Sequence, residues 1–88
     1  MVLFFVMTKQ EEFIKQIQTV LQTRNGIIMG TSILKNKLTK LNKDVASITK
    51  DDGKGLIESI ARAVSLFGTE DEANLVKAEL EKFLPLLS

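Results

Sequence analysis

Helical periodicity, with capping residues beside it, is the feature that most constrains the fold of this 88-residue chain. Over residues 8–24, apolar side chains recur three and four positions apart, which places them on one face of an α-helix. This face consists of Phe13, Ile14, Ile17, Val20 and Leu21. Thr8 and Glu11 have the spacing of a capping box, which satisfies two backbone N–H groups at a helix start. Asn25 and Gly26 then favour termination, because both tolerate the left-handed backbone of a C-terminal cap.

A second helix is predicted over residues 28–49, where spacings of three and four form a heptad seam. The seam consists of Ile27, Thr31, Leu34, Leu38, Leu41, Val45 and Ile48. We expect this helix to be the longest, with more apolar surface than three shorter helices can cover. Gly30 weakens the first turn, allows another helix to approach closely, or marks a delayed helix start near Thr31 or Ser32. The polar segment 49–55 contains two glycines and is predicted to separate this helix from the next.

Two further helices are predicted over residues 55–67 and 70–84. The apolar stripe of the first consists of Leu56, Ile57, Ile60, Ala61, Val64 and Phe67. Thr69 and Glu72 form a second capping-box pattern before the last helix, and Pro85 ends it. Short connections favour antiparallel neighbours. The sequence therefore predicts an all-α fold in a single domain, residues 1–88: a small antiparallel bundle of about four helices, which dimerisation could complete.

Residues 1–7 form an apolar prefix with two interpretations. In the interpretation that we prefer, Met7 is the true translation start. In the other, Val2–Val6 is an extension that docks on the bundle or on a second copy. The prefix lacks the leading basic residue and the cleavage site of a signal peptide. No segment reaches the roughly 18 apolar residues that a membrane span requires. We therefore expect a cytoplasmic protein without a membrane span.

The sequence offers no motif for catalysis or for metal and cofactor binding. It has no Cys and no His, which excludes a disulfide framework, a structural zinc site and nearly all His-based catalysis. Gly53-Lys54-Gly55 lacks the spacing of a phosphate-binding loop. Glu58 is the nearest candidate for acid–base chemistry, but Arg62 four residues later indicates a surface ion pair. We predict a protein that is not an enzyme and that binds no cofactor or metal.

The net charge of +1 conceals a basic segment followed by an acidic one. The candidate basic face for partner binding consists of Arg24, Lys35, Lys37, Lys40 and Lys43. In the interpretation that we prefer, these cations pair with the acidic fourth helix, within the chain or across a dimer. In the other, they face an anionic partner. Nucleic acid is not favoured as that partner, because the face has a single arginine and no interleaved aromatic residue.

Apolar residues beside the main stripes provide a second candidate surface. They are Ile28, Met29, Ile33, Leu86 and Leu87. These side chains either complete a wide core or form an interface with another chain. A small domain without disulfides or metals also gains stability by oligomerisation. The leading hypothesis is a non-catalytic protein-interaction module that self-associates as a homodimer, and the alternative is a nucleic-acid-binding regulator that uses the basic face.

In size, charge and four-helix antiparallel arrangement, the chain resembles the small cytosolic immunity proteins of bacteriocin producers. The resemblance concerns the fold, and it implies a helical bundle in the cytosol. Because one fold hosts many functions, a bacteriocin-immunity-like role is a further alternative.

Overall fold

The computed structural model describes residues 8–87, which contain four α-helices, two short 3₁₀ helices and no strand. The α-helices are α1 (Lys9–Asn25), α2 (Ile27–Leu41), α3 (Lys50–Phe67) and α4 (Glu70–Glu81), and the 3₁₀ helices are η1 (Val45–Ser47) and η2 (Leu84–Leu87). The predicted all-α fold is confirmed. The apolar prefix, residues 1–7, lies outside the described residues.

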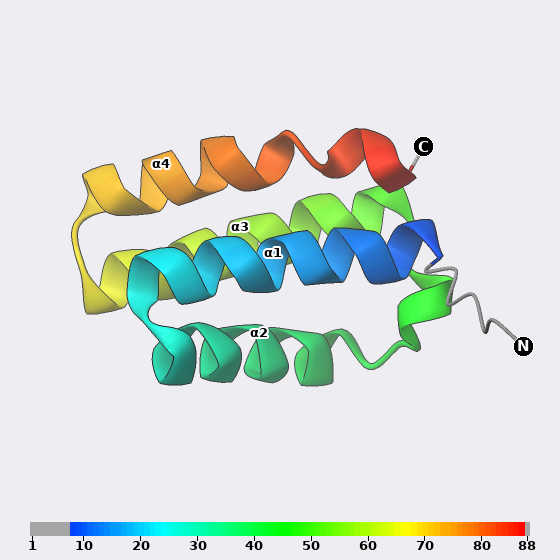
Figure 1. Ribbon diagram of the computed structural model, residues 1–88, viewed down its shortest axis with the longest axis horizontal. Coiled ribbons are helices and arrows are strands. Elements are labelled where there is room, and N and C mark those ends of the chain that lie inside the picture. The colour runs from blue at the N-terminus through cyan, green and yellow to red at the C-terminus, as the bar shows by residue number, and fades with distance from the viewer. Residues whose placement is uncertain (1–7, 88) are drawn as a thin grey trace, which may run out of the picture.

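The helices form two antiparallel hairpins, α1 with α2 and α3 with α4, and both hairpin turns lie at the same end of the bundle (Figure 1). We call this end the turn end. The hairpins join because α2 packs against α3 and α1 packs against α4. Each helix contributes side chains to one core. Its largest fully buried members are Phe13, Ile17, Leu21, Ile57, Ile60, Val64, Val76 and Leu80.

The predicted capping box at the start of α1 is present. Thr8 Oγ1 accepts a hydrogen bond from the Glu11 N–H at 3.1 Å, and the Thr8 N–H donates to Glu11 Oε1 at 3.2 Å. At the other end, α1 and α2 meet at Gly26, whose φ of 88° favours glycine. Gly30 is buried where the two helices touch: a Cβ atom there would lie 2.7 Å from the Leu21 carbonyl carbon. Of the three interpretations of Gly30, close approach is therefore correct, and the delayed start is wrong because α2 begins at Ile27.

The predicted extent of α2 was wrong. The helix ends at Leu41 rather than at residue 49, because Asn42 adopts the left-handed conformation (φ 54°) and its N–H donates to the Leu38 and Thr39 carbonyls. With 15 residues, α2 is shorter than α1 (17) and α3 (18), so it is not the longest helix. The predicted heptad seam does not form one continuous buried face of α2. Val45 and Ile48 lie beyond α2, and Ile27 is 72% exposed.

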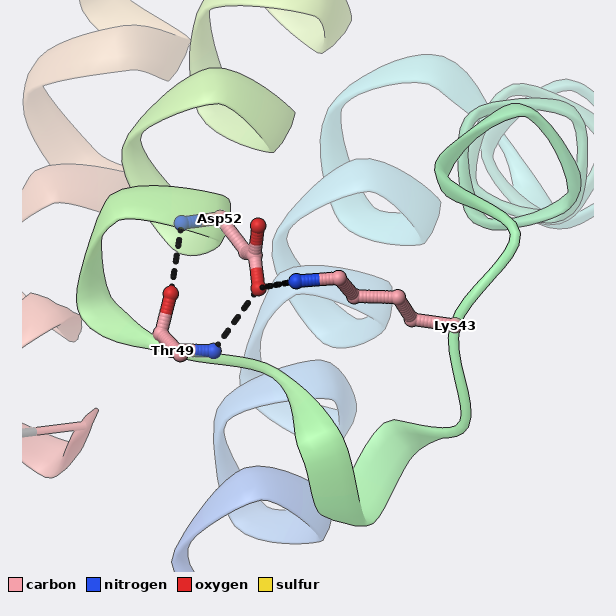
Figure 2. Close-up of polar contacts among 3 residues, drawn as sticks. All are labelled: Lys43, Thr49 and Asp52. Carbon is pink, nitrogen blue, oxygen red and sulfur yellow. Dashed lines mark hydrogen bonds and ion pairs between the residues drawn. The ribbon is translucent and has the colours of Figure 1, made fainter.

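The predicted break at residues 49–55 was wrong as well, since α3 begins at Lys50. A capping box starts this helix: Thr49 Oγ1 accepts from the Asp52 N–H at 3.2 Å, and Asp52 Oδ2 accepts from the Thr49 N–H at 3.0 Å. The same carboxylate oxygen also accepts a hydrogen bond from Lys43 Nζ at 2.8 Å (Figure 2). The polar residues that resemble a loop in the sequence are therefore the first turn of a helix.

Gly53 lies inside α3, and the space where its side chain would be is occupied because η2 packs over it. A Cβ atom at Gly53 would lie 2.6 Å from Leu87 Cδ1 and 3.3 Å from both Leu84 Cδ2 and Phe13 Cζ. The last helix, predicted to reach residue 84, ends at Glu81, and Pro85 lies within η2. At its start, the Thr69 hydroxyl accepts from the Glu72 N–H at 3.1 Å. The hydrogen bonds described for residues 8–87 do not include the reverse bond, so half of the second capping box is present.

Candidate functional site

A groove of about 650 Å³ lies between α2 and α3, at the junction of the two hairpins. We call it the α2–α3 groove. Ile33 and Ala63, exposed by only 5% and 8%, lie deepest among the residues that line it. Ser32, Asn36 and Ser59 are short polar residues along the same walls. Short side chains on both facing helices leave space that larger residues would fill.

At the turn end, the groove is apolar and open to solvent. Met29 contributes from α2, and Leu66 and Phe67 contribute from the last turn of α3. Their exposed fractions are 39%, 83% and 64%. Single exposed apolar residues are common on protein surfaces, whereas several that line one concavity mark an interaction site. Ile28, 85% exposed, follows the turn that joins α1 and α2, at the same end of the bundle.

Away from the turn end, the groove is basic. Lys37 and Lys40 are three residues apart on one face of α2, and Arg62 lies on α3 one turn before Leu66. None of the described residues that line the groove is acidic. Across residues 8–87, Lys37, Lys40 and Arg62 make no ion pair. These three cations are therefore unpaired within the described chain, although Arg62 also lines a second hollow that includes Glu58 and Glu70.

The five residues of the predicted basic face do not form one surface. Arg24 pairs with Glu79 of α4, with Nε and Oε2 2.6 Å apart, as the preferred interpretation predicted. This hydrogen bond is the main reason that the pKa of Arg24 is raised. Lys43 pairs with Asp52 of α3 instead of the acidic helix, and it is the main reason that the pKa of the Asp52 carboxyl is lowered. Lys35 is exposed outside the groove, which leaves Lys37 and Lys40 as the two that line it.

The predicted apolar surface is divided in the same way. Met29 and Ile33 line the groove, Met29 at its surface and Ile33 buried at its base. Leu86 and Leu87 are half-buried against the core in η2, which packs on α1 and α3. η2 lies at the opposite end of the bundle from the turns (Figure 1). These leucines therefore belong to the wide core rather than to the groove.

Sequence reasoning missed the α3 wall of the groove. Phe67 was assigned to the apolar core stripe of its helix, yet it is 64% exposed. Arg62 was expected to pair with Glu58, but Glu58 pairs with Lys77 of α4, at 3.8 Å between Oε1 and Nζ. The available signal was that Arg62 and Leu66 are four residues apart, outside the stripe of α3. Helical spacing alone does not show which neighbour such a row faces.

The described residues offer little for chemistry. Across residues 8–87, no three carboxylates lie together as metal ligands, and none of the described helices is long and apolar enough to cross a bilayer. The hydroxyls of Ser32 and Ser59 line the groove with Lys and Arg but without a carboxylate. A comparison of the chain with protein-family models, curated proteins and solved structures returned no match.

Proposed function

We infer that this protein is a non-catalytic helical interaction module whose α2–α3 groove binds a segment of another protein. The observation that supports this inference is the combination of exposed Leu66 and Phe67 with unpaired Lys37, Lys40 and Arg62 in one concavity. Burying a Leu or Phe side chain that is otherwise in water contributes about 1.5–3 kcal/mol. Two exposed apolar residues at the mouth of one groove mark a candidate interaction site.

Binding accounts for the lining better than catalysis does. A serine nucleophile requires a general base within hydrogen-bond reach. Histidine does not occur in the chain, and the described lining has no carboxylate. Lysine can also act as the base, but the described side-chain hydrogen bonds include none between Lys37 or Lys40 and a serine. The lysines and the arginine of the groove are suited to attracting an anionic group, which is a task of recognition.

Self-association through this groove is disfavoured by its charge. A two-fold dimer through this groove would bring Lys37, Lys40 and Arg62 of both copies into one interface, whose described lining has no carboxylate to offset them. Like charges across an interface cost several kcal/mol, so we propose that the partner is a different chain. The solution mass, measured by light scattering on the full chain and on a version that begins at Met7, tests this point. A dimer of both versions that dissociates after Leu66→Ser with Phe67→Ser would contradict the proposal.

Nucleic-acid binding is the second candidate, because three cations line one site. The apolar half of the lining counts against it, since protein–nucleic acid interfaces are more polar and much more positive than protein–protein ones. Fluorescence anisotropy with labelled single-stranded and duplex 20-mers at about 50 mM salt distinguishes the two candidates. Binding to the single-stranded or the duplex 20-mer that weakens steeply with salt would favour nucleic-acid binding.

Photo-crosslinking in the cells that make the protein tests the proposed function directly. A benzoylphenylalanine at position 67 would place the reactive group at the groove, and one at position 78, exposed on α4, is the matched control. We expect a defined crosslinked protein from position 67 that is absent from position 78. Equal products from both positions, or none from position 67, would refute a protein-binding groove. Fractionation of the same cells tests the proposed cytoplasmic location.

A further inference from the structure

We propose that the segment bound in the α2–α3 groove is an amphipathic helix of another protein, with large apolar side chains at one end and acidic side chains at the other. This proposal rests on the proposed function, because it requires the groove to bind a protein segment. It adds the conformation and the charge of that segment, and the direction in which it lies.

The walls of the groove favour a helix over an extended peptide. Both walls are α-helices, and away from the turn end their backbone N–H and C=O groups are already bonded within α2 and α3. An extended segment would find few backbone partners along the groove, whereas a helix satisfies its own backbone. Met29 and Lys40 are eleven residues apart on α2, a length of about 16 Å at 1.5 Å per residue. The groove therefore accommodates about three turns of a partner helix.

The lining changes from apolar to basic along this length. Met29, Leu66 and Phe67 form the apolar end, and Lys37 lies eight residues beyond Met29, about 12 Å along the axis of α2. A complementary helix places apolar anchors one turn apart and acidic residues about two turns further along the same face. Because a helix C-terminus carries partial negative charge, we place the C-terminal half of the partner near Lys37 and Lys40.

Other occupants fit the described residues less well. An acyl chain needs an enclosed pocket, but Leu66 and Phe67 are mostly exposed. An anionic membrane would be repelled by the acidic first turn of α4, residues 70–72, which lies at the turn end (Figure 1). The α4 helix of a second copy is acidic but exposes one large apolar residue, Leu75, and its insertion into the groove would build an assembly that does not close.

Two stapled 16-residue helical peptides test the proposal. One has two leucines a turn apart and glutamates about two turns further along that face, and the other has lysines in place of those glutamates. Each of the three cations should change the affinity by a factor of a few, so we expect a preference of about ten-fold for the acidic peptide. Fluorescence anisotropy measures the affinity of each peptide. Lys37→Glu with Lys40→Glu should reverse this preference. Leu66→Ser with Phe67→Ser should abolish binding, and Leu75→Ser on α4 should leave it unchanged.

Circular dichroism shows whether each variant retains its helices. Equal affinity for both peptides, no saturable binding of the acidic peptide, or binding that Lys37→Glu with Lys40→Glu leaves unchanged would overturn the proposal. Stronger binding to anionic lipid vesicles than to the acidic peptide would overturn it in favour of a membrane. If position 67 still crosslinks a protein in cells, the groove binds protein and only the chemistry assigned to the partner is wrong. If neither experiment succeeds, the proposed function fails as well.

Discussion

Replacing Gly30 with alanine tests the close contact between α1 and α2. The added Cβ would lie 2.7 Å from the Leu21 carbonyl carbon and 2.8 Å from the Gln22 nitrogen, whereas ordinary contact begins at 3.4 Å. These atoms belong to the backbone, so they cannot rotate away as the end of a side chain can. The two helices must move apart by about 0.7 Å or deform.

Two opposing effects determine the size of the change. Overpacking a buried site costs about 1–3 kcal/mol. Replacing Gly with Ala within a helix stabilises it by at most about 1 kcal/mol, because the unfolded chain loses conformational freedom. Since the clash is with backbone, we expect the cost to lie in the upper half of its range. The net loss in the free energy of unfolding is then about 1–2 kcal/mol.

Gly55→Ala is the matched control. Gly55 also lies within a helix, but a Cβ atom there has nothing within 4 Å. This variant should gain about 0.5–1 kcal/mol. The two variants should thus differ by about 1.5–3 kcal/mol, which corresponds to roughly 6–24 °C in melting temperature for a domain of this size.

Urea denaturation followed by circular dichroism measures both variants against the parent chain. Equal slopes with different midpoints would show that stability itself has changed. If Gly30→Ala is as stable as Gly55→Ala, α1 and α2 do not approach as described, and the position of α2 beside the groove would have to be revised.

Four further substitutions have defined outcomes. Thr49→Ala removes the cap of α3 and should lower the free energy of unfolding by about 1 kcal/mol in the same urea assay; an unchanged midpoint would refute the α3 start at Lys50. Lys43 and the Thr49 N–H lower the pKa of Asp52 below its ordinary value of 3.8. Their contribution to stability is therefore present at a pH above 3.8 and is lost as the pH falls through the lowered pKa. Melting temperatures measured from pH 6 to pH 2 should therefore fall less steeply for Lys43→Ala than for the parent, and parallel curves would exclude this ion pair. Leu66→Ser and Phe67→Ser should each change the free energy of unfolding by less than about 0.5 kcal/mol, because both residues are exposed; a larger loss would mean that they belong to the core.

Local sequence signals were sufficient for most helix starts. The Thr8–Glu11 pair predicted the first residue of α1 because both partners of a capping box lie within four residues. The same signature, Thr49 followed by Asp52, was present at the start of α3, but two nearby glycines outweighed it. The reason for Gly53 lies more than thirty residues away, in Leu84 and Leu87, which pack where its side chain would be. No local pattern contains that information.

The candidate site was predicted in part, for a related reason. Met29, Lys37 and Lys40 were identified because apolar and basic residues off the main stripe of a helix are visible in its own sequence. Their counterparts Arg62, Leu66 and Phe67 were missed because the groove forms only where the two hairpins meet. Helical periodicity shows which residues share a face, but it does not show which faces of two distant helices lie together.

The hairpin arrangement has a consequence for the order of the chain. The start of α1 packs near η2, so the two ends of the described chain lie at one end of the bundle (Figure 1). A circular permutant that links residue 87 to residue 8 by a short Gly-Ser linker and opens the chain near the exposed Asn42 would place the α3–α4 hairpin first. Permutation is tolerated where chain ends are close and the new ends are exposed. The same bundle and the same groove should then form from the opposite order of the two hairpins.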